Sequence, residues 1–344
     1  MKALQLVGPS TFKVVDKPLP EISSSDVLIK VKACGICGSD IHGMDGSSGR
    51  RIPPVVMGHE ASGIIKQIGA DVADLNVGDR VTFDSTVFCN NCDYCNQDRV
   101  NLCDKRQVMG VSCGEFHRDG AFSEYVVCPA HICHQLPDGL SFEEAAFSEP
   151  VGVAVHAVNR SNVKQGDTAV VIGSGLIGLL VIQALQWRGC TQIIAIDLDD
   201  SRLKLAKQLG ATAEINSKQS DAVKSVLDLT SGGANHAFEV VGASVTVNMA
   251  IDCVRKGAAV TLVGNLSPEV TLPLQKVVTR ELTLFGSCAI NGEYPEALAA
   301  IAGGHIQVKP LITAQVNIED AANWFAKLKA AEQPYLKVLV CPGD

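Results

Sequence analysis

A glycine-rich turn between two apolar runs constrains the fold of this chain more than any other feature. Residues 168–172 form a short β-branched run, residues 176–187 carry apolar side chains at helical spacing, and residues 192–196 form a second apolar run. Buried parallel strands and the helix between them have these patterns, so the stretch predicts one strand–helix–strand unit. Three glycines of this unit fit the pattern GxGxxG: Gly173, Gly175 and Gly178.

The glycines and the helix after them predict a site for the pyrophosphate of a dinucleotide. Glycines at these places permit a tight turn, close approach of the backbone to phosphate, and close packing of helix on strand. We expect the N–H groups of Leu176 and Ile177, at the positive end of the helix dipole, to face the phosphates. The triplet alone is weak evidence, since such glycines are common without a ligand.

The acid at the end of the second strand strengthens this interpretation. Asp197 lies 19 residues after Gly178, where a carboxylate accepts hydrogen bonds from the ribose hydroxyls and repels a 2′-phosphate. Arg202 is a complication, because a guanidinium five residues further on can cover the adenine or tolerate a phosphate. Because Asp197 stands at the end of the strand, we predict that the coenzyme is NAD and not NADP.

The chain of 344 residues is long for one core, so we expect two domains. Residues 154–290 alternate short apolar runs with helical patterns, which predicts an α/β domain with a doubly wound parallel sheet. Ligands of such sheets bind at the carboxyl ends of the strands. Further cofactor-binding residues expected at these ends are Val241, Val263 and Ser287.

Residues 1–153 have a different pattern, with short β-rich runs separated by prolines and glycines. They predict an all-β domain, most simply a partly closed barrel, whose loops carry the reactive side chains. Residues 291–344 contain two helical patterns and a final strand, and we expect this tail to return to the first domain.

Two motifs in the first domain suggest a catalytic metal. The stretch CGICGSDIHG contains Cys37, Ser39, Asp40 and His42, and the tripeptide GHE with His59 and Glu60 follows 22 residues after Cys37. Zinc accepts thiolate, imidazole and carboxylate ligands, and a catalytic site keeps one position open. The alternatives are a solvated histidine and a buried core cysteine. A redox role for Cys34 and Cys37 is disfavoured because no strand–helix–strand pattern surrounds them.

Four cysteines in the lobe at residues 86–105 give a more specific signal. They have the spacing CxxCxxCx7C and lie among polar residues: Cys89, Cys92, Cys95 and Cys103. Four thiolates close the coordination shell of zinc, so this site is predicted to be structural. An iron–sulfur cluster is the rival, and the absence of a second such run or of a following Cys-Pro favours zinc.

Glu149 stands directly before Pro150 in an otherwise apolar helical pattern. A carboxylate in that position is expected to be buried, and buried carboxylates are normally paired or bound to a metal. The alternative is an acid that caps the helix.

Composition excludes several classes of protein. The chain is 47% hydrophobic and 19% charged, with a net charge of −8, which argues against a nucleic-acid partner or an anionic membrane surface. No apolar run reaches the roughly 18 residues of a membrane span, and the first residues lack the apolar region of a signal peptide. Thirteen cysteines then indicate metal ligands or reduced thiols, and we expect a cytoplasmic location.

The order of these motifs resembles the zinc-dependent medium-chain alcohol dehydrogenases over essentially the whole chain. The Glu-Pro motif and GHE resemble the polyol and sugar-alcohol branch. The resemblance implies a GroES-like catalytic domain, a Rossmann domain and two zinc ions per chain. It implies catalytic zinc at Cys37 and His59, with Glu60 and Glu149 as partners directly or through water. It further implies that Ser39 contacts the substrate oxygen and starts a proton relay to His42.

The expected reaction is oxidation of a secondary alcohol by NAD to a ketone, with a polyol, sugar alcohol or sugar-alcohol phosphate as the small-molecule substrate. Sorbitol is in doubt, because Ala289 and Ile290 stand where sorbitol dehydrogenases have an Arg-Tyr pair. Alternatives are oxidation of an amino alcohol such as L-threonine, and an inactive dinucleotide-binding protein.

Two further expectations concern phosphate and assembly. Arg50 and Arg51 are the candidates for binding a substrate phosphate. The resemblance suggests a homodimer or homotetramer, with the strand at residues 282–285 as a sheet edge for pairing.

Overall fold

The computed structural model describes residues 1–331 and 333–343. They divide into two compact units. Unit 1 contains residues 1–149, 290–302 and the chain from 308 onward, and unit 2 contains residues 150–289 and 303–307. Residues 303–307 lie in the tail that was expected to return to the first domain, and they group with unit 2 instead.

Unit 1 is built from short β-strands, as the turn-rich sequence predicts. A small antiparallel sheet contains β1 (Lys2–Gly8), β2 (Thr11–Asp16) and β4 (Val55–Val56). The larger sheet contains β3 (Asp26–Gly35), β5 (Glu60–Ile68), β6 (Arg80–Phe83), β11 (Tyr125–Pro129), β12 (Cys133–Gln135), β19 (Ile312–Val316) and β20 (Lys337–Val340). Two hairpin-like pairs are β7 (Thr86–Val87) with β8 (Gln107–Val108), and β9 (Val111–Ser112) with β10 (His117–Arg118).

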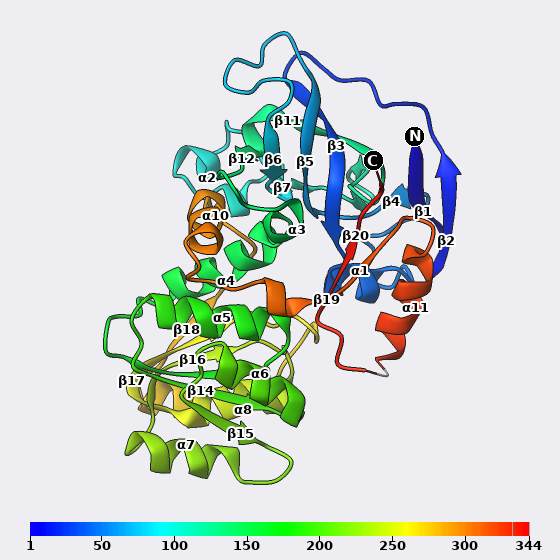
Figure 1. Ribbon diagram of the computed structural model, residues 1–344. Coiled ribbons are helices and arrows are strands. Elements are labelled where there is room, and N and C mark those ends of the chain that lie inside the picture. Colours follow the sequence, from blue (N-terminus) through cyan, green and yellow to red (C-terminus); the bar gives the residue numbers. More distant parts are fainter. Residues whose placement is uncertain (332, 344) are drawn as a thin grey trace. The chain divides into compact units, whose positions relative to one another are not determined.

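Strand β3 is the centre of the larger sheet, and it pairs with β5, β11 and β20. Its last residues, Cys34 and Gly35, pair with Val340 and Leu339 of β20, from the far end of the chain. Figure 1 shows this contact of the red final strand with the blue β3. The pairing brings the tail to the segment that carries Cys37.

Short helices connect these strands: α1 (Gly38–Gly43), α2 (Asp93–Asn96), α3 (Phe142–Ala145), α10 (Tyr294–Ala302) and α11 (Ala321–Ala330). Single 3₁₀ turns are η1 (Val100–Leu102), η2 (Ala130–Ile132) and η3 (Lys309–Leu311). Ser141 begins α3 with a capping box, since its hydroxyl accepts from Glu144 N–H and Glu144 accepts from Ser141 N–H. Helix α1 and strand β19 were not predicted from the sequence.

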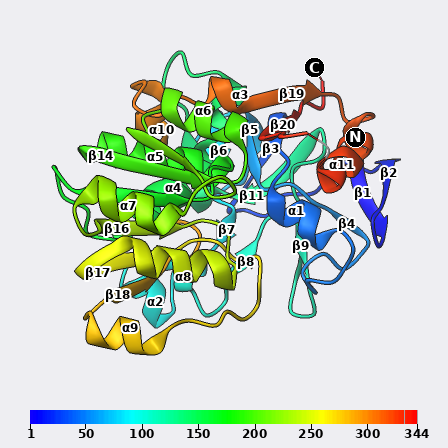
Figure 2. The same cartoon turned by 90° about the horizontal axis from the view of Figure 1, so that it is seen from below.

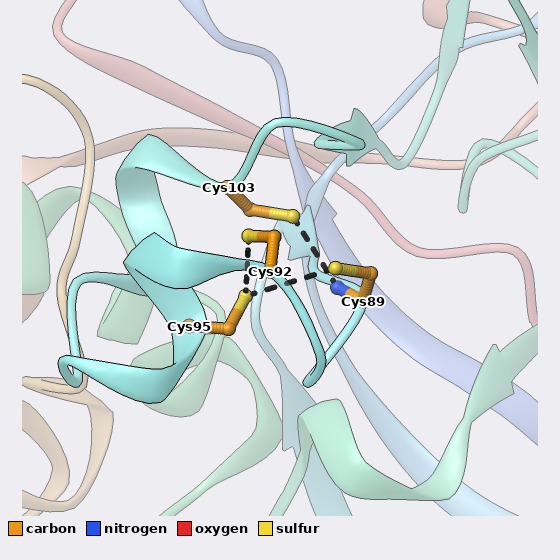
Figure 3. A group of neighbouring side chains, drawn as sticks. All are labelled: Cys89, Cys92, Cys95 and Cys103. Atoms are coloured by element: carbon orange, nitrogen blue, oxygen red, sulfur yellow. Dashed lines mark hydrogen bonds between the residues drawn. The ribbon is translucent and has the colours of Figure 1, made fainter.

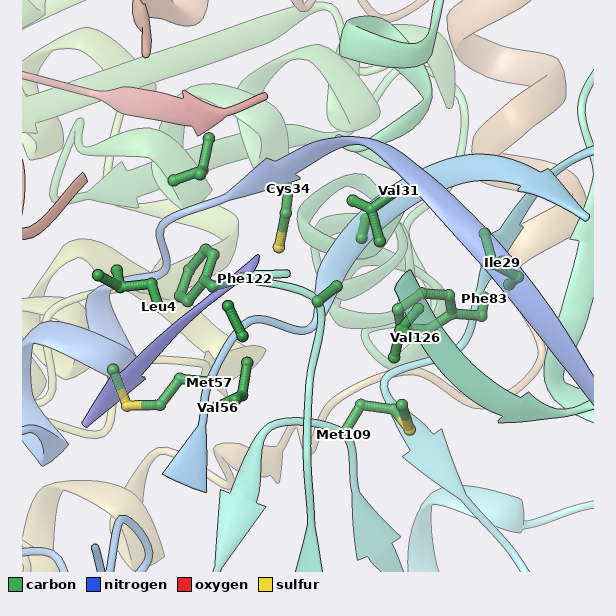
Figure 4. Packing of buried hydrophobic residues seen from close by; sticks show 14 of the residues in the cluster. Leu4, Ile29, Val31, Cys34, Val56, Met57, Phe83, Met109, Phe122 and Val126 are labelled. Atoms are coloured by element: carbon green, nitrogen blue, oxygen red, sulfur yellow. The ribbon is translucent and has the colours of Figure 1, made fainter. Parts of the chain in front are cut away.

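The core of unit 1 is a continuous apolar cluster that several of these strands supply (Figure 4). Phe122 is completely buried, and its ring meets Phe325 of α11 edge-on with 5.6 Å between centroids. Because α11 belongs to the tail, this contact and the β3–β20 pairing both fasten the tail to unit 1.

Unit 2 has the predicted doubly wound fold, with a six-stranded parallel sheet in the order β15-β14-β13-β16-β17-β18 among the described residues. Its strands are β13 (Thr168–Ile172), β14 (Gln192–Asp197), β15 (Ala213–Asn216), β16 (Ala234–Glu239), β17 (Val254–Leu262) and β18 (Thr283–Gly286). Its helices are α5 (Leu176–Trp187), α6 (Asp200–Gln208), α7 (Ala222–Thr230), α8 (Ser244–Cys253) and α9 (Leu274–Thr279). Helix α4 (Ser148–Arg160) begins in unit 1 and ends in unit 2.

Helices cover the two faces of this sheet (Figure 2). Helices α5 and α6 pack together over β13, β14 and β15, and helices α7 and α8 pack together against the sheet from the other face. The sheet grows from β13 toward β15 on one side and from β16 toward β18 on the other. Right-handed crossovers therefore place the helices of the two halves on opposite faces of the sheet. No helix in the described part of the chain combines the length and apolar character of a membrane span.

Replacing Phe122 with alanine is predicted to destabilise unit 1 by about 3–5 kcal/mol, because a fully buried ring is lost and a cavity remains. The chain has two tryptophans, Trp187 in unit 2 and Trp324 in unit 1. In a Trp187→Phe background, Trp324 fluorescence during urea denaturation therefore reports on unit 1. Val14→Ala, at a side chain that is 38% exposed, is the control and should change stability by less than about 0.5 kcal/mol. Equal effects of the two substitutions would contradict the assigned core.

Candidate metal centres and dinucleotide site

Three predicted metal ligands come together in unit 1. The ligand atoms of Cys37, His59 and Glu60 lie within 4.8 Å of one another. Cys37 precedes α1, His59 precedes β5, and Glu60 is the first residue of β5. The pairing of Gly35 with Glu60 in the β3–β5 ladder brings the two motifs side by side although they lie more than twenty residues apart.

The orientation of His59 suits metal binding. Its ring is buried, and Nδ1 lies 3.7 Å from Asp40 Oδ1 without a hydrogen bond to any described residue. With Nδ1 toward Asp40, Nε2 is the nitrogen available to a metal. Asp40 also accepts the N–H of Cys37 at 3.3 Å, so one carboxylate lies behind two candidate ligands.

The chemistry of the three donors fits zinc. Burial and then the negative charge of Glu60 raise the pKa of the Cys37 thiol. A bound divalent cation reverses this effect, because it stabilises the thiolate directly. Thiolate, imidazole and carboxylate together form a set that zinc accepts.

Glu149 is buried close to this group without belonging to it. Its Oε1 accepts a hydrogen bond from Ser85 Oγ at 3.1 Å, and its carboxylate is not among the ligand atoms within 4.8 Å of one another. Burial raises the pKa of Glu149 to about 7, while His59 opposes that rise through its charge. Glu149 is therefore a buried neighbour of these three residues that interacts electrostatically with His59 and Glu60.

The two predicted relay residues lie on α1. Ser39 and His42 are both exposed, and Ser39 Oγ accepts a hydrogen bond from Arg51 Nη2 at 3.4 Å. Ser39 follows the candidate ligand Cys37 by two residues in the sequence. Because its side chain is exposed, a small molecule can reach it.

Arg51 corrects one expectation. Its side chain is buried, and its Nη2 pairs with Asp40 Oδ1 at 2.9 Å. A guanidinium held in this way is not free for a substrate phosphate, so Arg51 is not a suitable candidate for that role. Arg50 is exposed and is unaffected by this finding.

The four-cysteine lobe is compact (Figure 3). The four sulfur atoms lie within 4.8 Å of one another, with Cys92 and Cys95 3.6 Å apart. Backbone N–H groups, first that of Cys95, lower the pKa of Cys92 to about 6, whereas burial raises the pKa of Cys103 to about 12. Four converging thiols without a disulfide fit one tetrahedral ion.

The predicted cofactor residues line the carboxyl edge of the sheet in unit 2. Gly173 N donates to Ile196 O at 2.8 Å, Val263 N to Glu239 O at 2.9 Å and Ser287 N to Leu262 O at 3.0 Å. These bonds join successive strand ends, and Val241 follows β16 at the same edge. Ser174 Oγ and Ser287 Oγ are buried polar atoms without a partner among the described residues, so the edge has unused polar groups to offer a dinucleotide.

The glycine turn after β13 has the required geometry. Gly173 has a backbone φ of +96°, which residues with a side chain rarely adopt. A Cβ at this position would also lie 2.7 Å from Val241 Cγ2. A Cβ on Gly178 would overlap the carbonyl oxygen of Gly173. The turn and the start of α5 therefore need glycine at these two positions.

Asp197 fastens this turn. Its Oδ2 accepts from Ser174 N at 2.6 Å, and its Oδ1 accepts from Leu198 N at 2.7 Å. Arg202 is partly exposed in α6, and its Nε has no partner among the described residues. The carboxylate thus lies between the glycine turn and the end of β14.

Two buried charged residues were not predicted from the sequence. Glu239 is completely buried and accepts the N–H groups of Val241 and Gly242 at 2.9 and 2.8 Å, which fixes the turn after β16. Lys337 is 2% exposed and pairs with Glu60 Oε2 at 2.5 Å. The signal for each was a charged residue inside an otherwise apolar strand.

Two family descriptions match most of the chain. Residues 23–138 match the alcohol dehydrogenase GroES-like domain, and residues 177–303 match the zinc-binding dehydrogenase domain.

Relatives of known name match over nearly the whole length. A probable D-xylulose reductase A from Emericella nidulans is 36% identical, over 98% of this chain and 96% of its own. The sorbitol dehydrogenase of Bacillus subtilis is 33% identical, over 100% and 98%. Among solved structures, a putative zinc-binding dehydrogenase from Sinorhizobium meliloti bound to NADP has a TM-score of 0.92 at 32% identity, over 99% of each chain.

Replacing Cys103 with serine is predicted to reduce bound zinc from two ions per chain to one and to lower the melting temperature, because the lobe loses a closing ligand. Zinc is measured by mass spectrometry after gel filtration. Cys190→Ser, at a buried free thiol of unit 2, is the control and should retain both ions. Retention of two ions by the Cys103 variant would contradict the assignment.

Proposed function

The chain belongs to the zinc-binding alcohol dehydrogenase family, and from that premise we propose that it oxidises a secondary hydroxyl of a polyol to a ketone with NAD as oxidant. The convergence of Cys37, His59 and Glu60 supports this proposal most directly. The named relatives support the choice of polyols, since one is a sorbitol dehydrogenase and another a probable D-xylulose reductase.

Two bound groups supply the chemistry. Zinc at Cys37 and His59 supplies Lewis acidity, which makes a nearby hydroxyl easier to deprotonate. NAD at the carboxyl edge of unit 2 supplies the hydride acceptor.

The chain's own residues then handle the proton and the orientation. Ser39 Oγ accepts a hydrogen bond from Arg51 and keeps a second lone pair to accept the O–H of the substrate, while its own O–H is free to donate onward. The proton released from the substrate passes to Ser39 and on to His42, whose exposure lets it reach solvent. Glu149 would hold the ion directly or through water. These roles follow the family resemblance, and the positions of the side chains are compatible with them.

The coenzyme is proposed to be NAD, although the similar Sinorhizobium meliloti protein binds NADP. Asp197 supports NAD, because a carboxylate held at the end of β14 repels a 2′-phosphate. Arg202 is the residue that could favour a 2′-phosphate instead, since its side chain is partly exposed at the start of α6 and its Nε has no partner among the described residues.

The substrate is proposed to carry no phosphate. Arg51 is held by Asp40, so of the two arginines expected for phosphate binding only the exposed Arg50 is left. A single solvated arginine is a weak phosphate site compared with a bidentate or clustered one.

A homodimer is the proposed assembly. Strand β18 pairs with β17 on one side and, within the described residues, with no strand on the other. An open strand edge is a template for pairing with the same edge of a second copy.

The cytoplasm is the proposed location. All thirteen cysteines are free thiols, including four that are fully assembled for a metal. Thiols persist in a reducing compartment.

A coenzyme-coupled screen tests the proposed reaction. NADH formation should be observed with pentitols or hexitols and should be much slower with L-threonine or with sugar-alcohol phosphates. Cys37→Ser should abolish turnover and should leave NADH binding, followed by its fluorescence, unchanged, because Cys37 and the coenzyme edge belong to different units. Exclusive oxidation of L-threonine would overturn the polyol proposal.

Replacing Asp197 with asparagine is predicted to raise the ratio of kcat/KM for NADP to that for NAD by about tenfold, because the charge that repels the 2′-phosphate is removed. The amide oxygen can still accept from Ser174 N, so the glycine turn should persist. Asp199→Asn, at the residue that caps α6, is the matched control. An unchanged ratio in the Asp197 variant would exclude Asp197 as the source of the preference.

A further inference from the structure

The candidate catalytic metal site is unusually rich in buried charge. Four groups carry negative charge when a divalent cation is bound: Cys37, Asp40, Glu60 and Glu149. Asp40, Glu60 and Glu149 are each at least nine-tenths buried. Two cations are buried with them, Arg51 at 4% and Lys337 at 2% exposure.

Lys337 neutralises Glu60 from the direction of the final strand. Its Nζ lies 2.5 Å from Glu60 Oε2 and also donates to the carbonyl oxygen of Ile36 at 3.0 Å. The β3–β20 pairing fixes the lysine there, since Ile36 N donates to Val338 O at 2.9 Å. A Cβ on Gly35 would overlap Glu60 Oε2 and lie 3.1 Å from Lys337 Cδ, so Gly35 leaves room for this pair.

Arg51 neutralises Asp40 behind His59. Its Nη2 lies 2.9 Å from Asp40 Oδ1, the oxygen that is 3.7 Å from His59 Nδ1. Its Nη1 donates to the carbonyl oxygen of Arg50 at 3.1 Å. The two cations therefore pair with different carboxylates. Lys337 pairs with Glu60, a candidate ligand, and Arg51 pairs with Asp40, which lies behind the candidate ligand His59.

The charges balance when zinc is included. The divalent ion and the two cations together equal the four negative charges, with His59 neutral. Without the cations, the same ligands would leave the centre with two surplus negative charges, which would bind zinc more tightly and make it a weaker Lewis acid.

We propose that Arg51 and Lys337 are positioning residues that act as counter-cations of the catalytic metal, limiting the affinity of the site for zinc and preserving the acidity of the ion. This inference rests on the proposed function, since it requires a metal at Cys37 and His59. It goes beyond that function by giving roles to two residues that are not ligands.

The direction of the change in zinc affinity separates this role from a structural one. If Lys337 or Arg51 only supports the fold, its loss loosens the ligands and weakens zinc binding. If either acts through its charge, its loss leaves a carboxylate uncompensated beside the ion and strengthens zinc binding.

The experiment compares Lys337→Met and Arg51→Met with the charge-conserving variants Lys337→Arg and Arg51→Lys in the full chain. Arg50→Met, at the exposed neighbouring side chain, is the matched control. Zinc dissociation constants are measured by competition with a chromophoric chelator. Cys37→Ser identifies which of the two ions is released from the candidate site. The melting temperature of the zinc-free protein is measured in parallel.

Each methionine variant is expected to lower the zinc dissociation constant of this site by about tenfold and to lower the melting temperature of the zinc-free protein. Arg51→Lys and Lys337→Arg should instead keep both values close to those of the wild type. Weaker or unchanged zinc binding in the methionine variants overturns the inference. If Lys337→Met does not fold, the comparison of Arg51→Met with Arg51→Lys decides the outcome. A wild-type chain that binds one zinc, with no change in Cys37→Ser, would instead refute the proposed function.

Discussion

The pairing of the last strand with β3 is the constraint on which the candidate metal site depends. It joins residues near the two ends of the sequence and places Lys337 against Glu60 at the point where β3 leads into the Cys37 segment. The partner strand β5 delivers His59 and Glu60 to the same place. A local loop could not hold so many buried charges in register, whereas a sheet of three neighbouring strands fixes them through backbone hydrogen bonds.

Unit 2 forms its proposed dinucleotide site through contacts that are more local. Its parallel strands all end at one edge, so glycine turns, a helix N-terminus and one carboxylate meet there without long-range contacts between distant ends of the chain. Asp197, whose carboxylate is proposed to oppose a 2′-phosphate, also accepts the N–H of Ser174 in the glycine turn. The buried Glu239 fixes the neighbouring turn in the same way. The proposed coenzyme selectivity and the local order of the glycine turn therefore both depend on Asp197.

This difference explains what the sequence could predict. The strand at residues 168–172 and the helix at 176–187 were predicted with their observed bounds, since period and glycine punctuation are local signals. The four-cysteine cluster was equally local. Helix α1 is too short to show a period. Strand β19 does alternate apolar and polar residues, but over only five residues, and this short signal was overlooked. The pairing of Lys337 with Glu60 spans 277 residues, and that of Arg51 with Asp40 depends on how a loop folds back. No rule of sequence spacing predicts such contacts. For this reason Arg51 was considered a candidate for binding a substrate phosphate, although it pairs with Asp40.

The central claim is that Cys37 and His59 share a metal ion that is separate from the ion of the four cysteines. Anomalous X-ray scattering at the zinc edge, from crystals grown without added metal, tests it most directly. The account predicts two peaks per chain, one surrounded by the four cysteine sulfurs and one bonded to Cys37 Sγ and His59 Nε2. A single peak at the four cysteines, or a second peak away from Cys37 and His59, would contradict it.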